Sequence, residues 1–141
     1  MLEDQGYKLT GAAFEVYNEL GYGMAEEIYQ QSLEIELSQR GIPFQTKREL
    51  NVYYKDQPLT TRYRPDLVVF DEIVLKLKAV SDLVPEHESQ LFNYMRIARC
   101  PVGYLLNFGK RGQLEWKRFI LSDLHQKRTD PTINPSSLSL Y

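Results

Sequence analysis

Chemically reactive side chains concentrate in the stretch RPDLVVFDEIVLKLKAV, residues 64–80. Its two apolar runs hold one carboxylate, Asp66, and two ammonium groups, Lys76 and Lys78. Because an unpaired charge in a buried strand is strongly unfavourable, we expect these three groups to face one another. Carboxylates that hold Mg²⁺, beside a lysine that orients or activates an attacking water, make a phosphodiesterase site. The stretch is therefore a candidate for a site of this kind.

The alternation of side chains along a strand predicts how these groups are arranged. Lys76 and Lys78 are two positions apart, so they point to one face of the strand, and Leu75 and Leu77 point to the other. If residues 66–70 and 73–80 pair as a tight hairpin, Asp66 reaches the lysine face from the neighbouring strand. The connection between the two runs lacks the glycine that tight hairpin turns favour, so the register is left open.

Periodicity predicts the elements that must position these groups. Apolar residues recur at steps of three or four over residues 7–20, 25–40 and 86–99, which indicates three helices. Apolar and β-branched runs indicate strands over 49–54, 66–70, 73–80, 102–108 and 114–120, with a turn at 55–58. This order predicts an α/β fold in which a central mixed β-sheet is flanked by α-helices and the hairpin is buried on both sides.

The length of 141 residues suits one domain, which we place at residues 1–124. Residues 125–141 contain prolines and serines without an amphipathic period, so we interpret them as a C-terminal tail or strap. The start of the chain resembles no signal peptide, and no segment is apolar enough to span a membrane. We expect a soluble, cytoplasmic protein.

Charge and composition exclude several classes of function. A formal charge of −2 makes binding of nucleic acid depend on a local basic patch. The single cysteine, Cys100, excludes an intrachain disulfide and a cysteine-cluster metal site. His87 and His125 are too few and too far apart for a zinc site, and we expect His87 to pack or hydrogen-bond on its helix. No Walker loop, GxSxG elbow or dinucleotide fingerprint is present.

Two motifs resemble those of a known family. Pro65-Asp66, nine further residues and then Lys76-Leu77-Lys78 resemble the PD-(D/E)XK nuclease signature, in which an acid precedes the lysine by two positions. The segment GMAEEIY, residues 23–29, is similar to the GxxExxY pattern of a small family of prokaryotic proteins in that superfamily. The resemblance extends over roughly residues 8–120, and its flanking segments are residues 11–21, 35–44, 87–95 and 103–109.

This resemblance implies a restriction-endonuclease-like core and assigns roles to individual residues. Glu26 would be the carboxylate from the helix, Asp66 the central metal ligand and Lys78 the catalytic lysine. Gln90 would face the site from the third helix. The implied cofactor is Mg²⁺, and the implied substrate is DNA or RNA. By the same resemblance the protein is expected to form a homodimer.

Lys76 departs from the family pattern, because it occupies the position of the motif acid. With an acid there, the four groups Glu26, Asp66, position 76 and Lys78 would carry a formal charge of −2; with Lys76 the charge is zero. A unit charge pair about 4 Å apart interacts by roughly 4 kcal/mol at the effective dielectric of a protein. We therefore hypothesise that Lys76 takes the place of the cation, pairs with Asp66, and impairs or abolishes cleavage.

Alternatives remain open at several positions. Another acid, Glu34, Glu72 or Glu88, would restore a metal site only if its carboxylate lay close to Asp66 and Glu26. Lys76 would alternatively be an isolated substitution in an active enzyme. The competing class of function is a protein-interaction or structural module that keeps only the fold.

Single residues also have ordinary structural explanations. Glu26 suits the first turn of a helix through its dipole, and Gln90 suits an exposed helix position. Arg62 and Arg64 are candidate nucleic-acid-binding residues. With Lys47, Arg48, Lys110 and Arg111, they would form either a phosphate-binding surface or ordinary surface charge.

Overall fold

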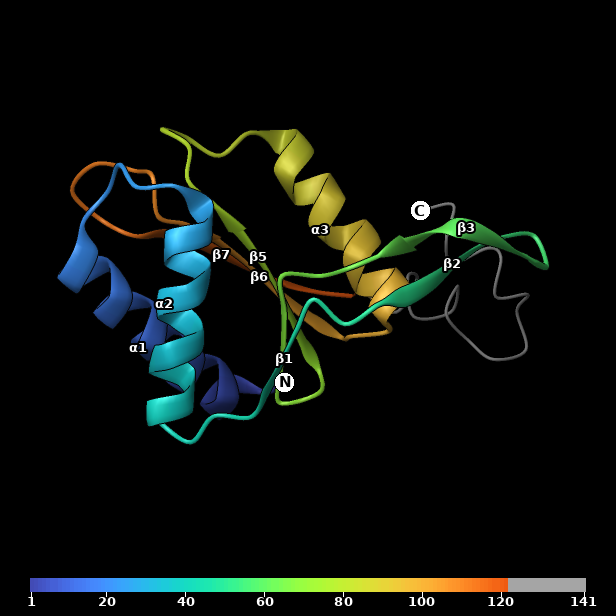
Figure 1. Ribbon diagram of the computed structural model, residues 1–141, viewed down its shortest axis with the longest axis horizontal. Coiled ribbons are helices and arrows are strands. Elements are labelled where there is room, and N and C mark those ends of the chain that lie inside the picture. The colour runs from blue at the N-terminus through green and yellow to red at the C-terminus, as the bar shows by residue number, and fades with distance from the viewer. Residues whose placement is uncertain (122–141) are drawn as a thin grey trace.

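The computed structural model describes residues 1–121 and has a mixed α/β architecture (Figure 1). In chain order its elements are α1 (Glu3–Leu20), α2 (Glu26–Gln39), β1 (Phe44–Thr46), β2 (Leu50–Tyr54), β3 (Gln57–Tyr63), β4 (Leu67–Val69), β5 (Ile73–Lys78), α3 (Pro85–Ala98), β6 (Val102–Asn107) and β7 (Glu115–Ile120). All three expected helices and all five expected strands are present, and the bounds differ by a few residues. The predicted tail, residues 125–141, lies outside the described residues, and the domain boundary at 124 stays a prediction.

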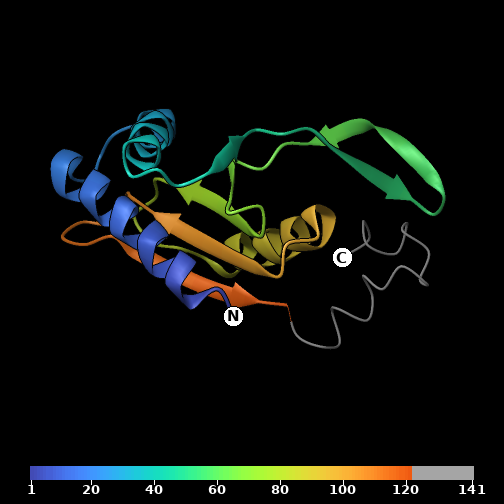
Figure 2. The ribbon, with the colours of Figure 1, turned by 90° about the horizontal axis from the view of Figure 1, so that it is seen from below.

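Five of the strands form one mixed sheet in the order β1-β4-β5-β6-β7. The two central strands, β5 and β6, are parallel, and all other neighbours are antiparallel. Parallel neighbours need a crossover connection, which α3 provides. Helices α1 and α2 cover one face of the sheet and α3 covers the other (Figure 2). The expected mixed sheet flanked by helices is therefore confirmed.

Alternation along β5 divides its side chains between two cores. Leu75 and Leu77 belong to the core beneath α1 and α2, whereas Val74 belongs to the core beneath α3. Lys76 and Lys78 share the parity of Val74, so both lie on the α3 face. The apolar runs are continuous because each face of this central strand is covered by a helix.

The β4–β5 hairpin closes through a tight turn without glycine. Phe70 and Asp71 both have positive φ angles, 55° and 61°, and the Glu72 amide donates to the Val69 carbonyl at 3.3 Å. Two consecutive positive φ values are characteristic of the type I′ turn, whose twist matches that of paired strands. The resulting register places Leu67 opposite Leu75, so that Asp66 precedes the paired segment next to Lys76.

Two strands were not predicted from the sequence. β1 has three residues and pairs with β4 at the sheet edge, and such a length is too short for a periodic signal. β3 follows a shorter turn than the expected 55–58 and includes Pro58, which pairs with Tyr53. Nearly all of β3 is exposed, because β3 pairs only with β2 in a separate two-stranded ribbon. A strand without a buried face has no alternating apolar pattern.

The remaining sequence expectations concern Cys100, His87 and membrane insertion. Cys100 is a buried free thiol, and burial raises its pKa to about 11. His87 accepts a hydrogen bond from the Val84 amide at 3.1 Å, as expected for a residue that serves its own helix. Within residues 1–121, no helix is both long enough and apolar enough to cross a membrane.

Candidate active site on the α3 face of the sheet

The charged groups of the β4–β5 hairpin meet on the face that α3 covers. The Lys76 ammonium lies 3.5 Å from Asp66 Oδ2, and the two side chains are 22% and 20% exposed. The same Asp66 oxygen accepts a hydrogen bond from the Leu77 amide at 2.8 Å. Asp66 is therefore held by a charge partner and a backbone donor, which explains why a strand this buried tolerates both charges.

Asp66 and Glu26 lie along the same edge of β5. β4 begins at Leu67, so the β5 amides beyond that point have no strand partner on this side. Asp66 accepts from the Leu77 amide, and Glu26 Oε1 accepts from the Ala79 amide at 3.3 Å. These two amides are two residues apart, about 6–7 Å along the strand. The two carboxylates thus accept hydrogen bonds from β5 amides that would otherwise bond to a neighbouring strand. One oxygen of each carboxylate makes this bond.

The segment from Gly21 to Tyr29 has a structural basis for its residue pattern. Gly21 and Gly23 have positive φ angles of 71° and 100°, which glycine adopts without a steric penalty. The loop then folds onto Tyr29, whose hydroxyl donates to the Gly21 carbonyl at 2.5 Å and accepts from the Met24 amide at 3.2 Å. Glu26, in the first turn of α2, is exposed and is positioned by this arrangement.

Replacing Tyr29 with phenylalanine is expected to lower the free energy of unfolding by about 1–2 kcal/mol, because the loop loses a donor and an acceptor for two backbone groups. The ring is fully buried and stacks on Phe108 at 4.7 Å, so the substitution keeps the packing. Urea denaturation followed by circular dichroism measures the change. The matched control is Tyr22→Phe, at a half-exposed position in the same loop. Equal stabilities of the two variants would contradict this role of the hydroxyl.

Gln30 is a site residue that sequence reasoning missed. Its side chain is almost completely buried, and Nε2 donates to the Asp66 carbonyl at 2.9 Å and to Glu34 Oε2 at 2.8 Å. Gln30 thereby connects α2 to the residue that carries the central carboxylate. The available signal was its position four residues after Glu26, which places both on one helix face.

Two tyrosines lie beside the Lys76–Asp66 pair and were also missed as site residues. The Lys76 ammonium lies 5.9 Å from the centre of the Tyr94 ring, and Tyr94 stacks on Tyr63 with ring centres 4.2 Å apart. The Tyr63 hydroxyl is buried and has no hydrogen-bond partner in the part of the chain that the structure describes. Burial raises the pKa of Tyr63, and the nearby Tyr94 and Asp66 raise it further, so the hydroxyl stays a neutral donor.

Lys78 and Gln90 have no fixed partners among the described residues. Lys78 is partly buried on the same face of β5 as Lys76, and Gln90 is exposed one helical turn before Tyr94. Among residues 1–121, neither side chain makes a hydrogen bond or ion pair. Both remain available to a ligand, and their assigned roles stay predictions.

The acids considered as replacements for the motif carboxylate are occupied or distant. Glu34 accepts from Gln30, Glu88 pairs with Lys117 at 2.6 Å, and Glu72 lies in the turn at the opposite end of β5. Residues 1–121 contain no group of three or more His, Cys, Asp or Glu side chains that could hold a metal ion. With an ammonium 3.5 Å from the central carboxylate, the described residues do not fit a divalent cation.

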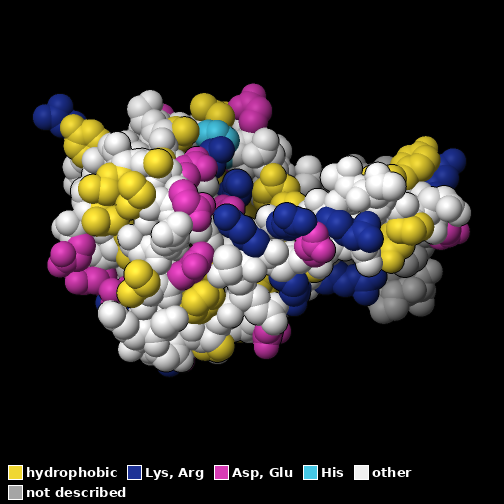
Figure 3. All heavy atoms as spheres, viewed as in Figure 1, with side chains coloured by type: hydrophobic (Ala, Val, Ile, Leu, Met, Phe, Trp, Pro, Cys, Tyr) yellow, Lys and Arg dark blue, Asp and Glu magenta, His cyan; other side chains and the backbone are white. Residues whose placement is uncertain are grey.

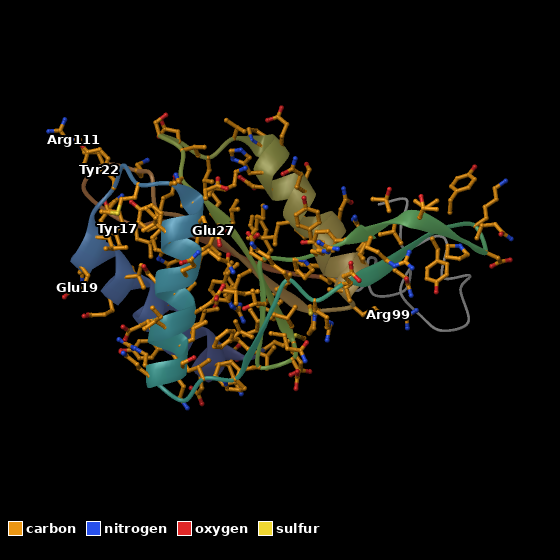
Figure 4. All side chains as sticks on the ribbon, in the orientation of Figure 1. Tyr17, Glu19, Tyr22, Glu27, Arg99 and Arg111 are labelled. Carbon is orange, nitrogen blue, oxygen red and sulfur yellow. The ribbon has the colours of Figure 1, made fainter. Side chains whose placement is uncertain are left out.

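The expected basic surface is divided between two ends of the molecule. Arg62 and Arg64 are exposed beside the site, and Arg64 pairs with Glu49. In Figure 4, Arg99 lies at the end of the molecule that carries the β2–β3 ribbon, and Arg111 lies at the other end. Lys110, next to Arg111, pairs with Asp82 at 3.3 Å. Lys110 and Arg111 therefore do not extend the surface formed by Arg62 and Arg64.

Comparisons with known proteins identify the family. No curated protein matches this chain. Among solved structures, the one described as "Crystal structure of SSO0001" is 16% identical with a TM-score of 0.56, and the match covers 73% of this chain and 56% of that chain. This chain thus spans just over half of that protein's length, and the likeness concerns the fold. A profile described as the PD-(D/E)XK nuclease superfamily matches residues 3–119. The chain belongs to the PD-(D/E)XK nuclease superfamily and has its restriction-endonuclease-like fold.

Proposed function

We propose that this protein binds nucleic acid through a nuclease scaffold whose own cleavage site is impaired. The observation that carries the proposal is the 3.5 Å separation of the Lys76 ammonium from Asp66 Oδ2. Family membership supports the scaffold and the class of ligand. The impairment follows from the charge at position 76.

The electrostatic argument rests on what the site offers to a Mg²⁺ ion. Catalysis of this type needs carboxylates that neutralise the cation, and the cation in turn stabilises charge on the phosphate. At position 76 the chain supplies a positive group, which repels the ion instead of binding it. One oxygen of Asp66 and one of Glu26 already accept backbone hydrogen bonds. The negative charge of the carboxylates is therefore neutralised by the ammonium groups of the chain itself, and the site needs no metal ion for neutrality.

Several features support nucleic acid as the ligand. Lys78 and Gln90 have no side-chain hydrogen bond or ion pair among the described residues. Lys78 shares a face of β5 with Lys76, and Gln90 is exposed on α3, the helix that covers this face. Lys47, Arg62 and Arg64 lie on segments that lead to the site. Basic groups in such positions contact phosphates and set the orientation of a nucleic acid.

We also propose membership of the GxxExxY family within the superfamily. The glycine at 23, the glutamate at 26 and the tyrosine at 29 each have a separate physical role in the loop and at the β5 edge. A homodimer is part of the same proposal, and sedimentation velocity would measure the oligomeric state directly.

A protein-interaction module is the second candidate. Its support is the outer side of α2, where Ile28 and Ile35 are 46% and 59% exposed. Exposed apolar side chains close together are typical of interfaces. In this case the fold would serve as a rigid body for a protein partner, and the basic residues would be ordinary surface charge.

Fluorescence anisotropy with labelled duplex DNA, duplex RNA and single strands distinguishes the two candidates. We expect binding whose logarithm falls linearly with the logarithm of salt concentration, unchanged by EDTA, and no cleavage with Mg²⁺ or Mn²⁺. Absence of binding to every probe would favour the interaction module. Metal-dependent cleavage by the unaltered chain would refute the impairment.

A further inference from the structure

The β2–β3 ribbon, residues 50–63, extends from the core as a separate arm (Figures 1 and 2). Its two strands pair with each other and with no strand of the main sheet. Most of its residues are exposed, including Tyr54, Thr60 and Thr61. A two-stranded ribbon is marginally stable alone in water, so an arm of this length suggests a surface that binds a partner.

The arm carries a charge opposite to that of the rest of the molecule. The arm itself, residues 50–63, contains two basic residues and one acidic residue, a formal charge of +1. With the residues that lead into and out of it, over 47–64, the charge is +3, whereas the whole chain has −2. Figure 3 shows a line of Lys and Arg side chains that runs from the middle of the molecule onto the arm. A positive arm on a negative body is attracted to a polyanion while the body is repelled, so binding is directed to the arm.

The base of the arm is fixed to the candidate active site. Tyr63, the last residue of β3, stacks on Tyr94 of α3, whose ring is contacted by the Lys76 ammonium. Two residues later the chain reaches Pro65, followed by Asp66. The stacked rings attach the base of the arm to α3, so a ligand bound at the base of the arm would lie beside the Lys76–Asp66 pair.

We propose that the β2–β3 arm is the main duplex-binding element and inserts into the major groove of B-form DNA. This proposal rests on the proposed function and specifies its ligand. The major groove, about 12 Å wide and 8.5 Å deep, admits a two-stranded ribbon. β3 has seven residues, which span about 23 Å and so exceed the depth of the groove. The deep, narrow major groove of A-form RNA does not admit the arm.

A second copy of the chain is a poorer occupant of this surface. Pairing two arms edge to edge would bring together two positively charged segments, each +3 over residues 47–64, and like charges directly opposed in a sheet are destabilising. Charge complementarity therefore favours the DNA backbone over self-association.

The test compares two variants that lose the same charge at different places. Lys55→Gln/Arg62→Gln removes two charges from the arm, and Lys8→Gln/Arg111→Gln removes two from exposed positions on α1 and the β6–β7 turn. Anisotropy with a labelled 30-base-pair duplex, from about 50 to 200 mM NaCl, measures affinity and salt slope. We expect the arm variant to bind at least tenfold more weakly with a slope lower by about 2, and the control to bind like the unaltered chain.

Weaker binding by the arm variant could also result from unfolding of the arm, so a variant that adds a charge is the second test. Thr60→Lys adds a charge at an exposed arm position and is expected to strengthen duplex binding severalfold. Equal binding by the arm variant and the control would overturn this inference while leaving the proposed function intact. Tighter binding of duplex RNA than of duplex DNA would also overturn it. If the unaltered chain binds no nucleic acid, this inference and the proposed function both fail.

Discussion

Replacing Lys76 with glutamate is expected to raise the affinity of this protein for Mn²⁺ roughly a thousandfold and to produce cleavage of nucleic acid. The substitution changes a repulsive charge into an attractive one beside Asp66. At the effective dielectric of a protein, a unit charge about 4 Å away contributes roughly 4 kcal/mol, and every 1.4 kcal/mol is a factor of ten. Lys78 remains on the same strand face, two residues after the new carboxylate, so the order of motif groups is complete.

Isothermal titration with MnCl₂ measures the first effect, and labelled single- and double-stranded substrates measure the second. Lys76→Met separates removal of the positive charge from addition of a negative one, and it should gain only part of the affinity. Lys76→Glu/Asp66→Asn should lose the gain, because the second carboxylate is absent. Tight Mn²⁺ binding by the unaltered chain, or an inert Lys76→Glu variant that is folded, would contradict the account of the site.

Substitution of Asp66 by alanine is expected to lower the free energy of unfolding by about 2–4 kcal/mol. The change removes the acceptor of the Leu77 amide and leaves the Lys76 ammonium, 22% exposed, without its carboxylate. Removing one member of a largely buried ion pair costs more than the pair itself contributes, because the remaining charge stays desolvated. Partial exposure of both side chains keeps the value below that of a fully buried pair.

A double-mutant cycle isolates the ion pair from the hydrogen bond to Leu77. Lys76→Met keeps an unbranched side chain against the Tyr94 ring and removes only the charge. In that background Asp66→Ala should cost about 1–2 kcal/mol less than in the unaltered chain, as measured by urea denaturation of all four proteins. Strictly additive losses would mean that the two groups do not stabilise each other, and the pair would lose its structural role.

Repetition along the chain was sufficient to predict most of the fold. Helices α1, α2 and α3 each carry apolar residues at steps of three or four. In β5, leucines at 75 and 77 alternate with lysines at 76 and 78. These periods arise from the geometry of a single element, so they are present in the sequence without knowledge of any partner. β1 and β3 were not predicted, because β1 is very short and β3 buries neither of its faces.

From residue spacing alone, without the family resemblance, the candidate site was predictable only where its residues are close in sequence. That Asp66 and Lys76 would share a face followed from a hairpin, because only nine residues separate them in the chain. Gln30 and Asp66 are 36 residues apart, and Glu26 and Ala79 are 53 apart. No local pattern encodes those contacts. The stacking of Tyr63 on Tyr94 similarly depends on where a ribbon without a strand partner in the main sheet meets α3.

Local chemistry thus specified the helices, the hairpin and the lysines on one strand face, since each depends on a repeat of 2.0 or 3.6 residues. Packing alone determined that two carboxylates accept from free amides of β5, that Gln30 anchors Asp66, and that a basic arm begins beside the Lys76–Asp66 pair. The physical reason is that these contacts join separate elements. Their geometry follows from how the helices lie on the sheet, and that arrangement depends on the whole core.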